Sequence, residues 1–441
     1  MAAENSPLNH LKYALATCLF TATALAANDW PQFRGPHGDG IADASSIPSN
    51  FEESNIAWKT DIPGMGWSSP VYSDDRIWIT TAETSAATPE QIAEKTKDVQ
   101  FAGIKTAAGK VNLRALCVDA NSGDILHNIL LREVEDPDLI NPLNSYASPT
   151  PALSGDKVIC HFGSYGTWCL NNATGQELWK NALVIDHSVG PGSSPVIAND
   201  VVLIVCDGID RQFVAGLDLN SGKLKWETPR PKLRATNPEF CKAYSTPLLI
   251  NVEGQPQAVI PGAQWMCAYN PETGKEIWRA DCGNGFSTTP MAVYADGLVI
   301  CSTGFMAPEL VAVNPSGTGD VTETNIVWRS KQGGSTMPTA VSNKGRIYSI
   351  SDNGILSVLN ATNGELIQQL RIGGKFAASP LLTDGKLFLG SQEGIMTVLN
   401  PTDVSRIAKN TMDGTLMASP AVMGSDLIIR TGKSLSRIAS K

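Results

Sequence analysis

Eight times along this chain of 441 residues, a serine, threonine or methionine followed by proline precedes two short apolar segments. The eight steps are Ser69-Pro70, Ser148-Pro149, Ser194-Pro195, Thr246-Pro247, Thr289-Pro290, Met337-Pro338, Ser379-Pro380 and Ser419-Pro420. The clearest copies then close on a Gly-containing turn and a tryptophan: Gly175 to Trp179, Gly222 to Trp226, and Gly274 to Trp278. A period of roughly 40–50 residues with several strands in each copy is typical of a β-propeller. The repeat predicts the architecture, whereas the function has to be argued from particular side chains.

Each copy is expected to form one four-stranded antiparallel blade. The inner strands are almost continuously apolar, as at 201–205, which is the pattern of strands covered on both faces. Residues 55–60 read as an outer strand with no copy before it, and the last copy, 417–440, stops before its own outer strand. We therefore predict an all-β, eight-bladed propeller whose ring closes when the N-terminal strand completes the C-terminal blade, which removes exposed sheet edges.

Five tryptophans occupy the same place in their copies, next to the outer strand: Trp58, Trp179, Trp226, Trp278 and Trp328. Repeated identical placement is what packing between neighbouring blades requires, so we expect these indoles to wedge between blades rather than to bind a ligand. His127 and Gln368 take the same position in the first and sixth copies.

The N-terminus is typical of an export signal. Lys12 precedes an apolar stretch, 13–25, that is too short for a stable membrane anchor, and Ala24-Leu25-Ala26 fits the small-x-small pattern cut by signal peptidases. We predict a signal peptide over 1–26 and a soluble mature protein in the periplasm or outside the cell. The residues before Cys18 fit a lipoprotein box poorly, so lipidation is not expected.

The mature chain divides into a lead-in arm over 27–54 and the propeller over 55–441, whose first blade carries an insertion over 81–110. Inside that insertion, Thr88-Pro89-Glu90-Gln91 combines an N-cap, a proline at the first helical position and a capping-box acceptor. These residues predict a short helix, to about Lys97, on one rim of the disc. A long insertion in a repeat protein often marks the binding face, although it is as often a decoration.

The charge of the chain argues against two classes of partner. It carries 34 Lys and Arg against 43 Asp and Glu, a net charge of -9, with no run of basic residues. We therefore expect neither nucleic acid nor anionic lipid as a partner, because both require a basic surface. The sequence after the signal contains no second stretch of membrane-spanning length, so no stable membrane span is expected.

Two cysteines have a suggestive spacing. Cys160 and Cys169 flank Gly163-Ser164-Tyr165-Gly166, and a two-residue hairpin turn centred there would place them opposite each other across two strands. At a non-hydrogen-bonded position their Cβ atoms would be close enough for a disulfide. Two packed thiols are the alternative, and the sequence leaves both open.

Residues just before each inner strand of a propeller converge on the mouth of the central channel. The candidate ligand-binding residues chosen there are Trp67, Tyr146, Lys242, Tyr244 and Phe286. With the neighbouring hydroxyl side chains they could grip a planar, peptide or sugar ligand. The alternative is that these side chains only plug the channel.

The Gly216-Leu217-Asp218 segment and the turn that leads from it to Trp226 resemble the repeat of pyrroloquinoline-quinone (PQQ) propellers. That family includes quinoprotein alcohol dehydrogenases and the propeller lipoprotein of the outer-membrane assembly machine. The lead-in Trp30-Pro31-Gln32-Phe33-Arg34-Gly35-Pro36 is similar to that of exported PQQ-repeat proteins of planctomycete type. The resemblance covers 55–441 and is specific for the fold.

For an enzyme of this family, the resemblance implies PQQ and a calcium ion over the channel, with a vicinal disulfide and a tryptophan against the quinone and an aspartate as base. Calcium needs six to eight oxygen ligands. The sequence has no adjacent pair of cysteines and no Cys-x-x-Cys-His for a covalent haem. Its histidines after the signal, His37, His127, His161 and His187, show no metal-ligand spacing, so no catalytic or metal-binding residue is assigned.

The sequence thus favours an exported, non-enzymatic propeller that binds envelope proteins through its rim loops or through its blade edges by β-augmentation. The first alternative is a PQQ-dependent or degenerate quinoprotein oxidoreductase acting on alcohols or sugars, with PQQ and calcium as its cofactors; otherwise no cofactor is predicted. The second is a carbohydrate-binding propeller. The partner is not identified, and the oligomeric state stays open, with a monomer as the simplest case.

Overall fold

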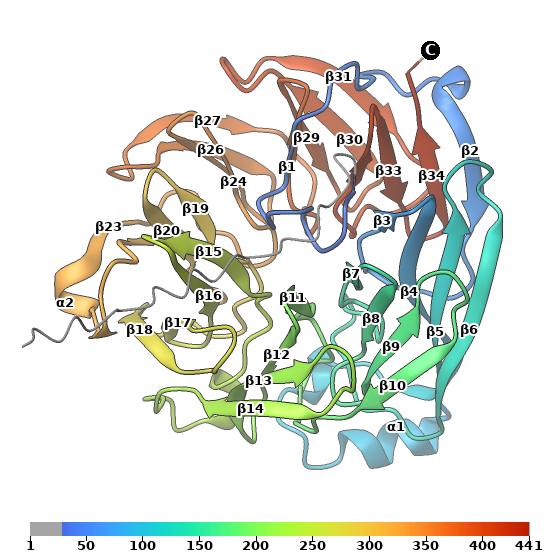
Figure 1. The fold of residues 1–441 in the computed structure, drawn as a ribbon, viewed down its shortest axis with the longest axis horizontal. Helices are drawn as coiled ribbons and strands as arrows, with labels where there is room; N and C mark the ends of the chain where they lie inside the picture. The colour runs from blue at the N-terminus through green and yellow to red at the C-terminus, as the bar shows by residue number, and fades with distance from the viewer. Residues whose placement is uncertain (1–28, 441) are drawn as a thin grey trace, which may run out of the picture.

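The computed structural model describes residues 29–440, which form eight sheets arranged as blades around a central channel (Figure 1). The predicted signal peptide and Cys18 lie outside the described residues. Seven blades contain four antiparallel strands in chain order, and the eighth combines strands from both ends of the chain. The all-β, eight-bladed prediction is confirmed. No helix within 29–440 is long and apolar enough to cross a membrane.

Blades 1 to 4 have the following strands, from the channel outwards: β3 (Val71–Ser73), β4 (Arg76–Ala86), β5 (Ala108–Asp119) and β6 (Ile125–Val134); β7 (Ala152–Ser154), β8 (Lys157–His161), β9 (Thr167–Asn171) and β10 (Glu177–Asn181); β11 (Val196–Ala198), β12 (Val201–Asp207), β13 (Gln212–Asp218) and β14 (Leu224–Pro229); β15 (Leu248–Val252), β16 (Gln255–Pro261), β17 (Trp265–Tyr269) and β18 (Glu276–Asp281).

Blades 5 to 8 continue in the same way: β19 (Val293–Ala295), β20 (Leu298–Ser302), β21 (Leu310–Val313) and β23 (Ile326–Ser330); β24 (Val341–Asn343), β25 (Arg346–Ile350), β26 (Ile355–Asn360) and β27 (Leu366–Arg371); β28 (Leu381–Thr383), β29 (Lys386–Gly390), β30 (Ile395–Leu399) and β31 (Arg406–Thr411); β32 (Ala421–Met423), β33 (Asp426–Arg430), β34 (Ser434–Ile438) and β2 (Ile56–Asp61). Two short strands extend blades 7 and 4, namely β1 (Ile41–Ala42) and β22 (Gly319–Asp320).

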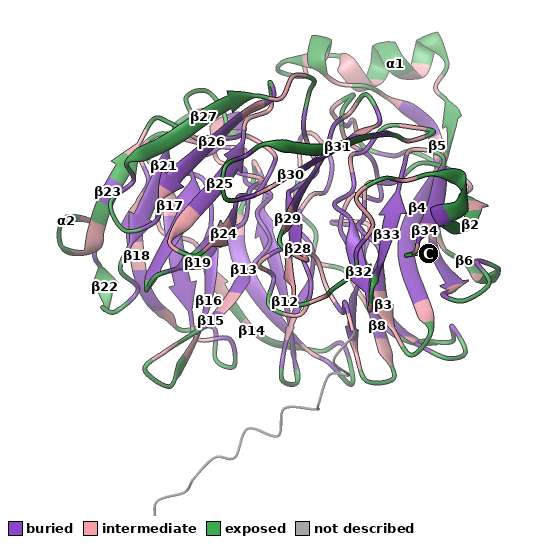
Figure 2. Cartoon of the chain, turned by 90° about the horizontal axis from the view of Figure 1, so that it is seen from above, coloured by how far each residue is buried: buried purple, intermediate pink, exposed green. Residues whose placement is uncertain are grey.

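The remaining elements are short: α1 (Pro89–Thr96), α2 (Thr322–Asn325) and the 3-10 turns η1 (Glu53–Asn55), η2 (Ala102–Ile104) and η3 (Pro238–Phe240). The helix predicted in the insertion is α1, and the Thr88 side chain accepts a hydrogen bond from the Gln91 backbone as the capping box requires. Figure 2 shows α1 standing above one face of the disc. The insertion therefore lies on one face of the propeller.

The ring closes as predicted. Strand β2 pairs antiparallel with β34, with Lys59 opposite Ser436, so the N-terminal strand is the outermost strand of blade 8. Trp58 on this strand is buried, and its Nε1 donates to the Ala120 carbonyl of blade 1 (2.9 Å). The two ends of the chain are thereby joined through packing as well as through the β ladder.

The indoles wedge between blades because the next blade offers a glycine turn. A Cβ added to Gly123 in blade 1 would lie 2.8 Å from the Trp58 ring, and Gly222, Gly274 and Gly364 stand in the same relation to Trp179, Trp226 and Trp328. All four glycines have positive φ, between +68° and +82°, which favours glycine independently of the indole. His127 takes the indole place in blade 1, with its Nε2 lying 3.0 Å from the Ala173 carbonyl oxygen of blade 2.

A belt of hydroxyl groups links the blades around the channel. Two residues before each innermost strand, a backbone N–H donates to the hydroxyl oxygen at the same place in the next blade, over 2.9–3.1 Å. The eight belt positions are Ser69, Thr150, Ser194, Thr246, Met291, Thr339, Ser379 and Ser419. Met291 has no hydroxyl group, so the belt consists of seven such bonds and is interrupted between blades 4 and 5.

The belt corrects the alignment of three repeat steps. In blades 2, 5 and 6 the belt positions are Thr150, Met291 and Thr339, each of which lies two residues after the Ser, Thr or Met of the predicted step. The eight predicted steps gave the right number of blades. In these three blades, however, the proline of the predicted step lies in the loop before the belt position; these prolines are Pro149, Pro290 and Pro338.

Of the two alternatives for Cys160 and Cys169, the structure contains the pair of packed thiols rather than a disulfide. The Phe162 N–H donates to the Gly166 carbonyl, so the tip of the hairpin between β8 and β9 has three residues, 163–165, rather than two. As a result, Cys160 pairs with Trp168 and Cys169 pairs with Ile159. A shift of one residue in a β ladder moves a side chain to the other face of the sheet. Cys160 therefore packs between blades 1 and 2, Cys169 packs between blades 2 and 3, and both are free thiols.

The lead-in arm closes the channel from one side. Strand β1 pairs parallel with β28, and Trp30 pairs with Tyr72, so the arm contacts innermost strands beyond the belt. Arg34 is buried, and its guanidinium donates to the carbonyls of Ala340 (2.7 Å) and Thr339 (3.3 Å). Burial lowers the pKa of Arg34 to about 10, which leaves it charged at neutral pH. The channel is thus blocked at the end where the arm lies.

Candidate functional site

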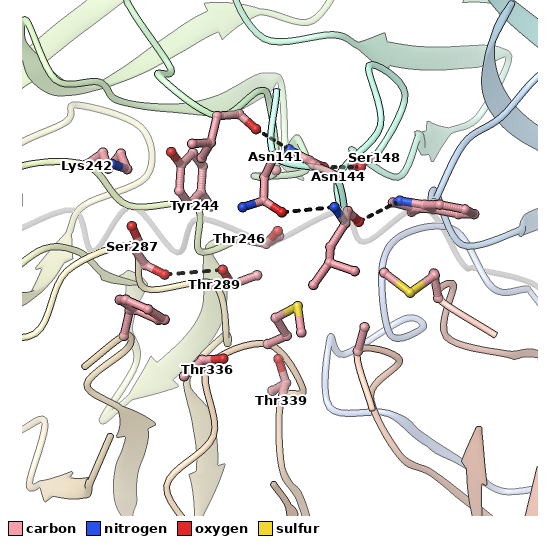
Figure 3. A pocket seen from close by; sticks show the side chains of 18 of the residues that line it. Asn141, Asn144, Ser148, Lys242, Tyr244, Thr246, Ser287, Thr289, Thr336 and Thr339 are labelled. Carbon is pink, nitrogen blue, oxygen red and sulfur yellow. Dashed lines mark hydrogen bonds between the residues drawn. The ribbon is translucent and has the colours of Figure 1, made fainter. Parts of the chain in front are cut away.

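The open end of the channel forms a funnel with a volume of about 580 Å³. Its wall contains the belt hydroxyls of Ser69, Ser194 and Thr246, and Phe33 of the arm also lines it. In the sequence of each blade, the mouth residues come before the belt position, and the residues that contact the arm come after it. The arm and the mouth therefore lie on opposite sides of the belt, and Phe33 of the arm lies at the inner end of the funnel. Figure 3 shows polar side chains from several blades around this space, including Lys242, Tyr244, Ser287 and Thr336. The funnel has a closed floor.

Four of the five predicted mouth residues line this funnel, namely Trp67, Lys242, Tyr244 and Phe286. The Trp67 Nε1 donates to the Leu143 carbonyl (3.0 Å), and the Tyr244 hydroxyl donates to the His187 carbonyl (2.7 Å), so hydrogen bonds fix both rings. Both rings present apolar surface to the funnel while their polar atoms bind the wall.

Tyr146 does not line the funnel. Its side chain is buried in the core between blades 1 and 2, 6.1 Å from the Tyr165 ring, and its hydroxyl donates to the Asp138 carbonyl (2.6 Å). Burial raises its pKa. The Tyr146 side chain thus turns away from the channel, whereas Asn144 and Ser148 of the same loop line the funnel.

A buried charge cluster forms one part of the wall. The Glu239 carboxylate binds Lys105 (Nζ to Oε1, 3.0 Å), Lys242 and the hydroxyl of Ser188 (2.7 Å). The side chains of Lys105, Glu239 and Lys242 are 4%, 6% and 6% exposed. Lys105 comes from the insertion in blade 1, whereas Glu239 and Lys242 come from the loop around η3. The cluster fastens the insertion to the loop between blades 3 and 4.

Both oxygens of Glu239 are occupied in this cluster. Burial would by itself raise the pKa of Glu239, but the hydrogen bonds from Lys242, Ser188 and Lys105 outweigh it and hold the pKa below its usual value. Burial lowers the pKa of Lys242, while the bond to Glu239 opposes that shift. A carboxylate held ionised by two ammonium groups is a poor proton acceptor, so Glu239 does not suit general base catalysis at neutral pH.

Aromatic rings continue the wall beside the cluster. The Phe240 and Phe286 rings are 4.5 Å apart between centroids, and the Phe286 and Phe305 rings are 5.8 Å apart and nearly perpendicular. Lys242 Nζ lies 6.0 Å from the Phe286 centroid, which is within the range of a cation–π contact. Phe286 thus contacts Phe240, Phe305 and Lys242, so the three rings lie next to the charge cluster.

The rim of the funnel is apolar and exposed. Five lining residues keep about half or more of their surface in solvent: Met306 (74%), Ile104 (57%), Leu143 (51%), Phe305 (50%) and Phe101 (49%). They come from the loop after β20, from the insertion of blade 1 and from the loop before β7. Exposed apolar residues gathered around a pocket are typical of a binding site.

Sequence reasoning missed Lys105, Glu239, Phe240 and the rim residues, because they come from loops and from the insertion. The spacing of Glu239 and Lys242, three residues apart after Asn237-Pro238, could have indicated a local ion pair. For Lys105, 134 residues away from Glu239, the sequence alone carries no comparable signal.

The funnel does not fit a quinone held by calcium. Among its lining residues the one carboxylate is Glu239, whose oxygens already bind two lysines and a serine, and calcium needs several oxygen ligands that converge. Over residues 29–440 no three His, Cys, Asp or Glu side chains form a group that could hold a metal ion. No catalytic step through PQQ and calcium is therefore derived for this chain.

Fold and site together define an eight-bladed propeller with a blind, aromatic funnel at one end of its channel. Residues 50–255 and 309–407 match the family described as outer membrane protein assembly factor BamB. These segments make up most of the chain, so the protein belongs to this family of PQQ-like repeat propellers.

Solved structures show the same fold. A europium-containing methanol dehydrogenase is 11% identical with a TM-score of 0.62, covering 93% of this chain and 91% of that chain. The quinohemoprotein alcohol dehydrogenase from Comamonas testosteroni is 12% identical (TM-score 0.63; 95% and 82% covered). BamB from Moraxella catarrhalis is 16% identical (TM-score 0.50; 78% and 98% covered). At these identities the likeness concerns the fold alone. None of the curated proteins matches the sequence.

Proposed function

We propose that this protein is a non-enzymatic binding propeller of the cell envelope, which holds a partner protein in the funnel at the channel mouth. The observation that carries this proposal is the funnel itself, a cavity of about 580 Å³ with an exposed apolar rim. Specific binding sites combine an apolar pocket with a few fixed polar groups, and the funnel offers both. The envelope location is supported by the predicted signal peptide over 1–26 and by the family description.

The enzymatic alternative has less support in the funnel. A PQQ-dependent oxidoreductase needs oxygen ligands for calcium and a carboxylate free to act as base, and Glu239 is engaged with Lys105 and Lys242. The carbohydrate-binding alternative relied on the aromatic and hydroxyl side chains of the channel mouth. Three of these mouth hydroxyls already donate to backbone carbonyls, namely Ser193 to Ser245, Ser245 to Pro290 and Ser335 to Pro338.

Site-specific photocrosslinking in living cells tests the proposal. A photoreactive amino acid replaces Met306 on the rim of the funnel, or, as a matched control, Ile367 on the exposed outer strand β27. We expect a discrete adduct from position 306, lost when Phe286→Ala removes part of the wall, and no adduct from position 367. Adducts from position 367 alone would assign binding to a blade edge, and an absence of adducts from both would contradict the proposal.

A further inference from the structure

The charge balance of the funnel indicates what kind of group it accepts. Among the lining residues the charged ones are Lys105, Lys242 and Glu239, so the wall carries one positive charge in excess. All three side chains are more than nine-tenths buried. A buried charge without a counter-charge is costly, so this wall favours a ligand that brings one negative charge.

Other charged side chains near the cluster do not line the funnel. Asp186 influences the pKa of Lys242, but it is exposed, lies outside the funnel, and its Oδ1 accepts from the Ser188 backbone (2.7 Å). Each lysine makes two hydrogen bonds: Lys105 to Ser188 and Glu239, and Lys242 to the carbonyl (2.9 Å) and carboxylate of Glu239. An ammonium group has three N–H donors, so one donor on each lysine is available.

The shape of the funnel limits how a chain can enter. The arm closes the inner end, with Phe33 on the floor and Arg34 bound to carbonyl groups behind it. An extended segment that passes through a site needs two openings, whereas this site has a single one, framed by the apolar rim. A cavity of about 580 Å³ has room for a few residues at the end of a chain.

We propose that the funnel binds the carboxyl-terminal end of a partner protein, with its last apolar side chains against Phe240, Phe286 and Phe305 and its terminal carboxylate beside Lys105 and Lys242. This inference rests on the proposed function and specifies its ligand. The terminal carboxylate supplies the single negative charge, and charge-assisted hydrogen bonds to ammonium groups are among the stronger polar contacts. The exposed rim covers the apolar residues that precede the chain end.

Peptide binding by fluorescence anisotropy tests this inference on the purified protein. Three pools of labelled hexapeptides are compared, all randomised over Leu, Ile, Val, Met and Phe in the apolar part. The first pool ends in a free carboxylate, the second ends in an amide, and the third continues with a Gly-Ser tail after the apolar residues. We expect the free-acid pool to bind at least about tenfold more tightly than the other two.

The variant Lys242→Met keeps the apolar stem and removes the excess charge, so it should bring the free-acid and amide pools to similar affinities. Lys180→Met, whose lysine is 68% exposed on β10, is the matched control and should keep the tenfold difference. Lys105→Met serves as a second variant if Lys242→Met does not fold. Equal binding of the three pools by the natural protein, or no binding of any pool, would overturn the inference.

The two proposals can fail separately. If acid and amide pools bind equally and Phe286→Ala weakens both, the funnel still binds apolar peptides, and only the preference for a chain end is refuted. If no adduct forms from position 306 in cells, the proposed function fails whatever the peptides do.

Discussion

Two separate constraints require glycine in the turns before the outer strands: the backbone conformation and the space taken by an indole. Gly222 has φ of +68°, and an added Cβ would also overlap the Trp179 ring of the preceding blade. Gly385 has a similar φ of +63°, but a Cβ there meets nothing within 4 Å. Comparing substitutions at Gly222 and Gly385 therefore distinguishes the cost of backbone strain from the cost of the clash with the indole.

Gly222→Ala should destabilise the protein by about 1–3 kcal/mol more than Gly385→Ala, because overpacking adds to the cost of the positive φ. Urea unfolding of both variants measures the difference. Equal losses would show that the indole moves aside without cost and that the wedge contributes little.

The buried His161 and the half-buried His187 make stability depend on pH. Burial lowers the pKa of His161 to about 3, with His187 nearby adding to the effect, and burial lowers the pKa of His187 to about 4 against the opposing charge of Asp210. In the unfolded chain both titrate near 6.5, so below that pH the unfolded state binds more protons than the folded state. The stability that the neutral rings provide is therefore fully present above pH 6.5 and is lost progressively towards pH 4 and 3.

Between pH 7 and pH 5 the two groups should together remove about 4 kcal/mol from the free energy of unfolding. Urea titrations at both pH values test this, and the double variant H161N/H187N should show a clearly smaller pH dependence. A stability that is unchanged down to pH 5 in the natural protein would contradict the account.

At the scale of elements, β2 holds the ring closed. Trp58, 8% exposed, is the one buried side chain of this strand, whereas Ile56, on the other side of a bulge in the ladder, is 38% exposed. Trp58→Ala should cost about 3–5 kcal/mol because it removes a buried indole and its bond to Ala120, whereas Ile56→Ala on the same strand should cost less than about 1 kcal/mol. Thermal and urea unfolding measure both, and similar effects of the two variants would contradict the role given to Trp58.

The sequence predicted the elements well where a repeated physical requirement shapes them. The number of blades, the closing strand and α1 with its Thr88 cap follow from patterns in neighbouring residues. The length of the hairpin loop between Cys160 and Cys169 could not be predicted from the sequence, because the same residues, 163–166, are compatible with a loop of two or of three residues. That single residue decides which face each thiol occupies.

At the scale of the whole molecule, the site depends on contacts between distant segments. Trp67, Lys242, Tyr244 and Phe286 were predicted because they precede inner strands, and that position in a propeller leads to the channel mouth. The pairing of Lys105 with Glu239, 134 residues apart, and the closure of the channel by Arg34 depend on the folded ring. These contacts make the funnel blind and give its wall an excess positive charge.

The central claim is that the channel mouth binds a partner and does not carry quinone catalysis. Calorimetric titration of PQQ into the purified protein, with calcium and then with a chelator, tests this claim most directly. We expect no saturable binding that depends on calcium, because Glu239, the one carboxylate of the funnel, is held by Lys105 and Lys242. Saturable binding at about micromolar affinity or tighter that the chelator abolishes would contradict the claim and restore the oxidoreductase alternative.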